Sequence, residues 1–164
     1  MNYVFEDETY IALSEFAELV KKKPETILRR KKDIPCIKKF GNDWYALNGT
    51  RYPYKVNSFK IRSDWDRRYV LLKALDRPAY IDGKMLGVSP NEFDAYIQDF
   101  SNTGLIYENH NGNPHGANPY SCTLKGAEII KKSKIVAIKM IMEECAKCIG
   151  IIVGKVVSRT FPAL

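Results

Sequence analysis

The sequence lacks the features that secretion or membrane insertion would leave in a chain. No apolar segment of the signal-peptide kind follows the polar start Met1-Asn2-Tyr3. The longest apolar stretch, residues 135–157, contains five charged side chains that would each be costly at bilayer depth. The four cysteines are too few and too scattered for a disulfide framework. We therefore expect a protein of the reducing cytoplasm that has no membrane partner.

Motifs that would indicate catalysis or metal binding are also scarce. Cys145-x-x-Cys148 has the spacing of a metal-binding pair, but no second pair of cysteines or adjacent histidines accompanies it. The spacing of His110 and His115 supports no site, and the aspartates of residues 64–82 are typical of helix caps and surface charges. Neither a glycine-rich phosphate loop nor a serine elbow occurs. We expect structural cysteines, no metal, no cofactor and no enzyme activity.

Positive charge is what the sequence does have, and it is concentrated near the N-terminus. The formal net charge is +7 on a chain of 18.8 kDa. Residues 1–60 carry 12 basic and 8 acidic side chains, whereas residues 61–134 carry 10 and 9. Residues 21–32 alone hold seven Lys or Arg and one acid, Glu25. Such a density favours a phosphate-rich partner, although an ordinary solvated cluster has the same composition.

The pattern of residues 10–47 predicts a helix, a turn, a second helix and a hairpin. Ser14 can cap the first helix. A second helix over residues 24–32 begins with a proline, whose missing N–H costs nothing at that position. Two short strands, residues 36–40 and 44–47, then flank a turn.

The residues of this region resemble a known family. Ile11–Ala17, Pro24–Arg30, Ile34-Pro35 and Trp44-Tyr45 are similar to the DNA-binding unit of phage excisionases and MerR-type regulators. The resemblance implies a winged helix-turn-helix, in which the second helix enters the major groove and the hairpin contacts the adjacent backbone. One departure is Lys31-Lys32-Asp33, where such units usually have a glycine.

The resemblance and the charge together define a predicted DNA-contacting set. Thr26 and Arg29 share one helix face, and Arg29 can offer two donors to guanine. The basic residues that follow are better suited to phosphates, because so short a helix presents only a narrow stripe to the groove. The full set, with the hairpin residues, is Lys21, Lys22, Lys23, Thr26, Arg29, Arg30, Lys31, Lys32, Lys38, Lys39 and Asn42.

Residues 61–132 predict a second unit of similar plan. Ser63 and Ser89 are expected to cap helices, the second with a capping box that ends in Glu92. Gly104 is the expected left-handed end of that helix. Gly104-Leu105-Ile106 and the later Thr123–Ile130 are similar to the winged-helix domain of MarR-like and PadR-like regulators.

The second unit differs from the first in charge. Its presumed recognition helix, residues 90–103, has three acidic and no basic side chains, and residues 109–118 have no Lys or Arg. Such a surface repels phosphates, so we expect this unit to serve dimerisation or protein contact. DNA contact there is limited to Lys84 or Lys125, with the two loop histidines adding charge below neutral pH.

An apolar stripe marks the C-terminal segment. Its residues recur at three- or four-residue steps and predict an amphipathic helix that pairs with its symmetry mate. The alternative is that this helix folds back on its own domain. The predicted dimerisation residues are Ile135, Ile138, Met142, Cys145, Ile149 and Ile152.

These patterns predict a mainly α fold with short β-hairpin wings. It would consist of two tandem winged helix-turn-helix units, residues 1–60 with the connector and 61–132, plus a C-terminal amphipathic helix, residues 133–164. The expected function is that of a homodimeric duplex DNA-binding protein, either a transcriptional regulator or a mobile-element accessory factor.

Three alternatives remain open. A replication-initiation or plasmid-partition adaptor would hold DNA with the first unit and recruit a protein with the second. A protein-interaction module would not bind DNA at all. Single-stranded nucleic acid could stack on the aromatic residues that lie near the basic ones, which are Phe40, Trp44, Tyr45, Tyr52 and Tyr54.

Overall fold

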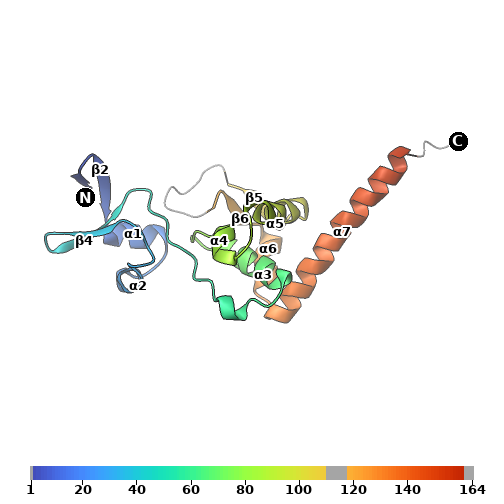
Figure 1. Cartoon of the computed structure of the whole chain (residues 1–164), viewed down its shortest axis with the longest axis horizontal. Coiled ribbons are helices and arrows are strands. Elements are labelled where there is room, and N and C mark those ends of the chain that lie inside the picture. The colour runs from blue at the N-terminus through green and yellow to red at the C-terminus, as the bar shows by residue number, and fades with distance from the viewer. Residues whose placement is uncertain (1, 110–117, 161–164) are drawn as a thin grey trace.

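The computed structural model describes residues 2–109 and 118–160, with side chains described as far as residue 149. An N-terminal unit lies beside a second, mostly helical unit, and a connector joins them (Figure 1). The last helix, α7 (Lys134–Thr160), begins against the second unit and extends away from it (Figure 1).

The N-terminal unit is built around a four-stranded antiparallel sheet of order β1-β2-β4-β3. Ile11 on β2 pairs with Ala46 on β4, and Ala46 pairs on its other side with Ile37 on β3. The strands are β1 (Tyr3–Phe5), β2 (Glu8–Ala12), β3 (Ile37–Phe40) and β4 (Asp43–Leu47), and the helices are α1 (Leu13–Leu19) and α2 (Pro24–Arg29).

This sheet shows that the predicted fold class, mainly α with short wings, is wrong. The β3–β4 hairpin is half of a larger sheet, so the whole fold is a mixture of α and β. Residues 3–12 form a second hairpin, which turns at Glu6 and Asp7, both with positive φ (50° and 64°). β2 then pairs with the inner edge of β4 and satisfies backbone groups that a free wing would leave to water.

Two helix boundaries also differ from prediction. Ser14 does not cap α1, because β2 runs directly into the helix: Ala12 is the N-cap residue, and Leu13 is already helical and buried. α2 ends at Arg29 instead of residue 32. Arg30 is the C-cap residue of this helix. The chain turns after it and buries Ile34 completely in the core.

The second unit consists of five helices and a two-stranded hairpin around its own core, entered through a 3-10 turn, η1 (Ser58–Lys60). Leu71, Leu72 and Phe100 are fully buried in that core. Besides α7, its elements are α3 (Asp64–Leu75), α4 (Gly83–Leu86), α5 (Pro90–Asn102), β5 (Ile106–Glu108), β6 (Tyr120–Cys122) and α6 (Leu124–Ile130).

The predicted caps of the second unit are confirmed. The Ser63 hydroxyl accepts from the N–H of Asp66 at 3.1 Å, and Ser89 with Glu92 forms a complete capping box. Gly104 has a φ of +67°, the left-handed conformation that lets α5 end. His110 and His115, and most of the loop between β5 and β6, lie outside the described residues.

Backbone hydrogen bonds of Tyr80 hold the connector against the second unit. The N–H of Tyr80 donates to the carbonyl of Tyr52, and the N–H of Tyr54 donates to the carbonyl of Tyr80, both at 2.7 Å. Ala79 is buried in the core of the N-terminal unit, and Tyr54 packs against both cores. The connector is therefore a paired, packed segment.

Only one face of α7 packs against its own unit. Its face with Ala137, Ile141 and Cys145 is buried in the second core. Within the described part of the chain, no helix combines the length and the apolar character that crossing a membrane requires.

Candidate nucleic-acid interface

The basic cluster of residues 21–32 surrounds α2 and the turn before it. Lys21, Lys23, Arg29 and Lys32 are all exposed. Lys21 has a φ of 50°, so the chain reverses sharply there. In the described structure none of the four forms an ion pair, so their full charge faces solvent. They form a patch of unneutralised cations.

Thr26 and Arg29 lie on one face of α2, as predicted. The guanidinium Nη2 of Arg29 donates to Thr26 Oγ1 at 3.4 Å. This weak contact keeps the exposed guanidinium above its own helix. Arg29 thus remains available to a partner that approaches α2 from solvent.

The β3–β4 hairpin adds to the patch. Lys39 and Asn42 are exposed, and Gly41 turns the hairpin with a φ of +60°. Lys31 on the α2 side holds its ammonium 4.7 Å from the centroid of the Trp44 ring on β4. That cation–π contact links the end of the helix to the hairpin.

Two of the predicted contact residues are committed to other partners. Arg30 donates to the Tyr52 hydroxyl at 3.1 Å, lies 5.0 Å from that ring and pairs with Asp33 at 3.4 Å. Lys38 lies 3.9 Å from a carboxylate oxygen of Glu8. Arg30 points toward the connector, and the charge of Lys38 is partly compensated.

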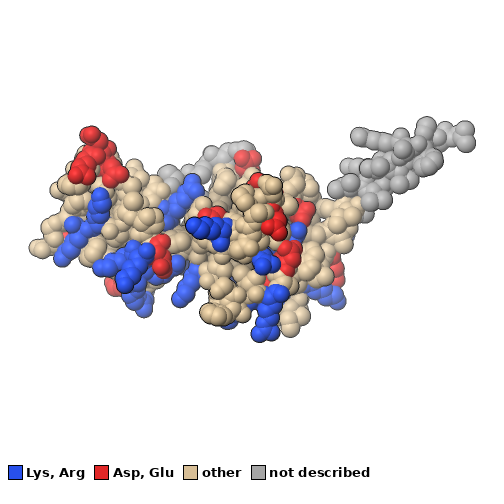
Figure 2. All heavy atoms as spheres, in the orientation of Figure 1, with Lys and Arg blue, Asp and Glu red and all other residues tan. Residues whose placement is uncertain are grey.

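Three acidic side chains of the N-terminal unit lie away from the patch. Glu6, Asp7 and Glu8 are exposed at the tip of the β1–β2 hairpin. Figure 2 shows this acidic tip at one end of the face and Lys and Arg side chains at the other. Glu25 on α2 and Asp33 are exposed nearer the cations, so the separation of charge is partial.

Some cations of the second unit are held within the fold. Arg68 on α3 pairs with Asp64 at 3.0 Å and with Asp99 at 2.6 Å. Its guanidinium also lies 4.4 Å from the centroid of the Tyr96 ring. Burial and a hydrogen bond to Asp64 raise the pKa of Tyr96 to about 12, so the phenol remains a donor.

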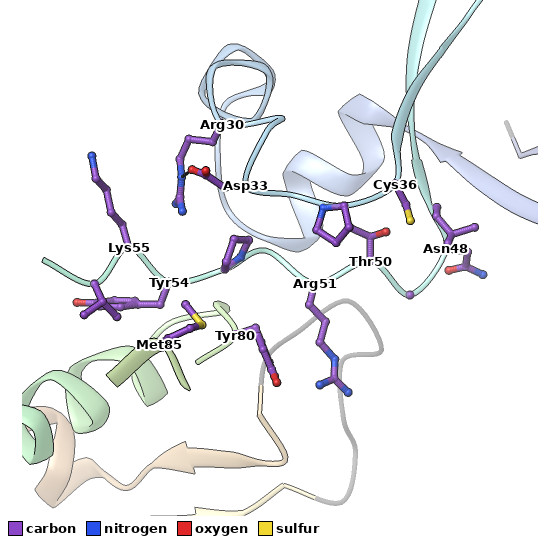
Figure 3. Close-up of a pocket in the computed structure, with 15 residues that line it drawn as sticks. Arg30, Asp33, Cys36, Asn48, Thr50, Arg51, Tyr54, Lys55, Tyr80 and Met85 are labelled. Atoms are coloured by element: carbon purple, nitrogen blue, oxygen red, sulfur yellow. Dashed lines mark hydrogen bonds and ion pairs between the residues drawn. The ribbon is translucent and has the colours of Figure 1, made fainter. Parts of the chain in front are cut away.

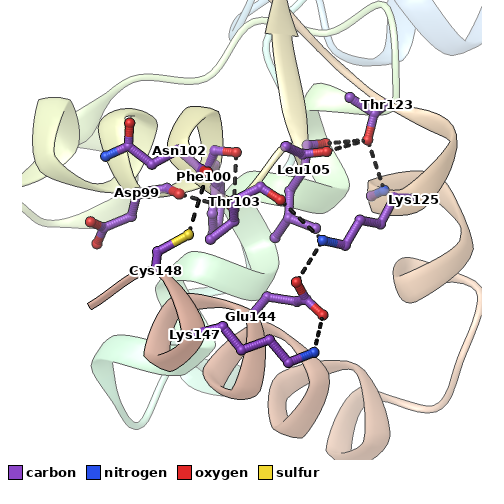
Figure 4. Close-up of polar contacts among 12 residues, drawn as sticks. Asp99, Phe100, Asn102, Thr103, Leu105, Thr123, Lys125, Glu144, Lys147 and Cys148 are labelled. Carbon is purple, nitrogen blue, oxygen red and sulfur yellow. Dashed lines mark hydrogen bonds and ion pairs between the residues drawn. The ribbon is translucent and has the colours of Figure 1, made fainter. Parts of the chain in front are cut away.

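Lys125, one of the two predicted weak DNA contacts of this unit, is also occupied. Its ammonium donates to the Thr103 carbonyl at 3.0 Å and to Glu144 at 2.5 Å, and so ties α6 to the end of α5 and to α7 (Figure 4). Lys147 reaches the other oxygen of Glu144 at 2.9 Å. Lys84 stays exposed.

A cavity that the sequence analysis missed lies where the two units meet. It has a volume of about 900 Å³ and is lined from both sides. Figure 3 shows Arg30, Asp33 and Cys36 on the N-terminal side and Tyr80 and Met85 on the other. The connector contributes further lining residues, among them Arg51, Tyr54 and Lys55. Residues 51–55 contain two basic and two aromatic side chains, and this combination was the available signal.

The predicted dimerisation stripe is divided by the structure. Cys145 is buried and Ile138 packs against the second core, as expected for a helix that folds back on its own domain. Ile135, Met142 and Ile149 stay exposed at seven-residue steps, with exposed fractions of 82%, 42% and 64%. The side chain of Ile152 lies outside the described ones.

The Cys145-x-x-Cys148 pair has no further metal ligands beside it in the described residues, where no group of three or more His, Cys, Asp or Glu could hold a metal ion. Cys145 is buried, and Cys148 Sγ donates to the Asn102 carbonyl at 3.4 Å.

Comparison of the chain with protein-family models, curated proteins and solved structures found no match.

Proposed function

We propose that this protein binds duplex DNA through α2, the turn before it and the β3–β4 hairpin. The observation that supports the proposal is a set of exposed cations on or beside these elements that form no ion pair with any described residue: Lys21, Lys23, Arg29, Lys32 and Lys39. Duplex DNA attracts such a patch because each phosphate contact releases a condensed counterion.

In this proposal different residues contact the phosphates and the bases. Lys23 and Lys32 flank the two ends of α2 and would contact the backbone on either side of a groove. Arg29 lies between them on the exposed face, where a guanidinium can bond two acceptors of one guanine. Lys39 on the hairpin would reach a neighbouring phosphate.

A salt series tests the proposal. We expect a fluorescent duplex of random sequence to bind with an affinity that falls steeply as salt rises. The triple variant Lys23→Ala, Arg29→Ala, Lys32→Ala should lower the slope of log K against log salt by about 2 to 3, or roughly 0.9 per lost phosphate contact.

The control removes the same charge from the other unit. Lys131, Lys132 and Lys139 are exposed, and their triple alanine variant should bind with a nearly unchanged slope. Equal slopes for wild type and the α2 variant would contradict the proposal and favour a protein-interaction module. Tighter binding of a single strand than of a duplex would instead favour stacking on the aromatic residues.

Dimerisation through α7 is a second part of the proposal. The exposed residues Ile135, Met142 and Ile149 form one stripe along a helix that extends beyond its unit. A symmetric pair of such helices would bury this stripe and place two copies of α2 on one duplex.

Light scattering at micromolar concentration tests the dimer. We expect the mass of two chains for wild type and of one chain for the variant Ile135→Glu, Met142→Glu, Ile149→Glu. Leu124→Glu, which changes an exposed apolar residue on α6, is the control and should remain a dimer. A wild-type mass of one chain would contradict this part of the proposal.

Several classes of duplex-binding protein have the features proposed here. We propose a transcriptional regulator or a mobile-element accessory factor in the cytoplasm. A replication or partition adaptor is the alternative, with the second unit as the surface for its protein partner.

A further inference from the structure

The cavity between the two units has the size and the walls of a small-molecule site. Its volume of about 900 Å³ is within the range of pockets that enclose drug-sized ligands. Much of the wall is apolar or aromatic, and both units contribute to it. The apolar and aromatic lining residues are Pro35, Leu47, Pro53, Tyr54, Val56, Tyr80 and Met85.

The charge of the cavity is positive. Arg30, Arg51 and Lys55 line it, and Asp33 is the acid among its lining residues. Asp33 is already paired with Arg30 at 3.4 Å. In the described structure Arg51 and Lys55 form no ion pair, so two cations remain available to an anion.

The positions of these cations suit a ligand with a ring. The Arg51 guanidinium lies 5.0 Å from the centroid of the Tyr80 ring, and Figure 3 shows Tyr54 next to Lys55, away from Arg51. A smaller cavity of about 150 Å³ shares Arg30, Tyr54 and Lys55 with this one and adds Lys22 and Arg77 to its lining. The positive field therefore continues beyond the main cavity.

We propose that this cavity binds a small organic anion with an aromatic body, its rings against Tyr54, Tyr80 and Met85 and its anionic group beside Arg51 or Lys55. The ligand class follows from the chemistry of the wall: apolar and aromatic surfaces recognise a flat ring, and unpaired cations recognise a carboxylate, sulfonate or phosphate. Because both units line the cavity, an occupant contacts both and stabilises them together.

Two dyes test the site without DNA, so the result is independent of the proposed function. 8-Anilinonaphthalene-1-sulfonate carries rings and an anion, whereas N-phenyl-1-naphthylamine has the same rings without the sulfonate. We expect the sulfonate to saturate at one dye per full-length chain and to bind about tenfold more tightly than the neutral dye.

The variant Arg51→Gln, Lys55→Gln should weaken sulfonate binding about tenfold and change binding of the neutral dye less than about twofold. Both residues are exposed, so the variant should fold, as circular dichroism can verify. The control Lys131→Gln, Lys132→Gln removes the same charge elsewhere and should bind both dyes like wild type.

Cys36 locates the bound dye. Its thiol is exposed and lines the cavity, so saturating sulfonate should slow its alkylation by iodoacetamide at least about threefold, because an occupant blocks access. Equal binding of the two dyes, unchanged binding in the Arg51 and Lys55 variant, or unprotected Cys36 would each overturn the proposal.

Discussion

The two units have nearly the same number of charges and use them in different ways. Residues 1–60 have 12 basic and 8 acidic side chains, and residues 61–134 have 10 and 9. In the second unit some acids lie beside cations, as Asp64 and Asp99 lie beside Arg68. In the first unit three acids lie at the tip of the β1–β2 hairpin, while the cations of α2 face solvent. Composition alone could not separate a cation that holds the fold from one that is free for a partner.

The largest effect on stability should come from Arg68. Its side chain is only 13% exposed, and it holds two carboxylates and stacks on aromatic rings. We expect Arg68→Ala to lower the free energy of unfolding by about 2–3 kcal/mol, since it removes two charge-assisted hydrogen bonds and the packing of a mostly buried side chain against aromatic rings. Urea denaturation measures this, with the exposed residue Lys132→Ala as a control that should lose less than about 0.5 kcal/mol. An Arg68→Ala variant as stable as the control would contradict the comparison.

Asp66 should give a smaller, pH-dependent effect. Its carboxylate pairs with Lys134 and accepts from the Arg62 N–H at 2.8 Å and the Ser63 hydroxyl at 3.1 Å. The ion pair with Lys134 and these hydrogen bonds lower the pKa of Asp66 from 3.8 to about 2. The resulting stabilisation, about 1–2 kcal/mol, is fully present above pH 4 and is lost as the pH falls toward 2.

Urea midpoints measured from pH 6 to pH 3 test this dependence. Lys134→Gln removes the largest cause of the lowered pKa, so it should be less stable than wild type at pH 6 and lose less stability on acidification. Lys131→Gln lies on the nearby α6–α7 turn and should follow the wild-type curve. Parallel curves for Lys134→Gln and wild type would show that the ion pair contributes nothing.

Arg30 is the exception within the first unit, because it is used within the fold. It donates to the hydroxyl of the buried Tyr52 and stacks on that ring. We expect Arg30→Ala to cost about 1 kcal/mol, mainly from the lost hydrogen bond and cation–π contact. Its neighbour Arg29→Ala should cost less than about 0.5 kcal/mol in the same urea assay. A larger loss for Arg29 than for Arg30 would reverse the assignment.

Local signals in the sequence predicted much of the second unit. Ser63, Ser89 and Gly104 occupy the positions that caps require, because a cap depends on residues within one turn. The four-stranded sheet was missed because the pairing of β2 with β4 joins residues more than thirty positions apart. Local patterns do not encode such long-range pairing.

Only part of the candidate interface could be predicted from the sequence. Clustering of basic residues located the exposed patch, including Arg29 and Lys32. It could not show that Arg30 turns toward Tyr52, because that contact depends on how the connector returns past α2. The location of the cavity could not be derived for the same reason, because its lining combines residues 30–36, the connector and residues 80–85.

Arg29→Lys should have the smallest effect and is the sharpest test of base reading. Lysine keeps the charge, so the stability, the affinity for random duplex and its salt slope should stay close to those of wild type. Lysine loses the planar pair of donors that can bond both acceptors of guanine. Selection of binding sites from a random duplex library should therefore give wild type a preferred guanine that the variant no longer enriches, a discrimination of about 1–3 kcal/mol. If both proteins enrich the same base equally, Arg29 contacts only phosphate, and any sequence preference must come from the hairpin or from the shape of the DNA.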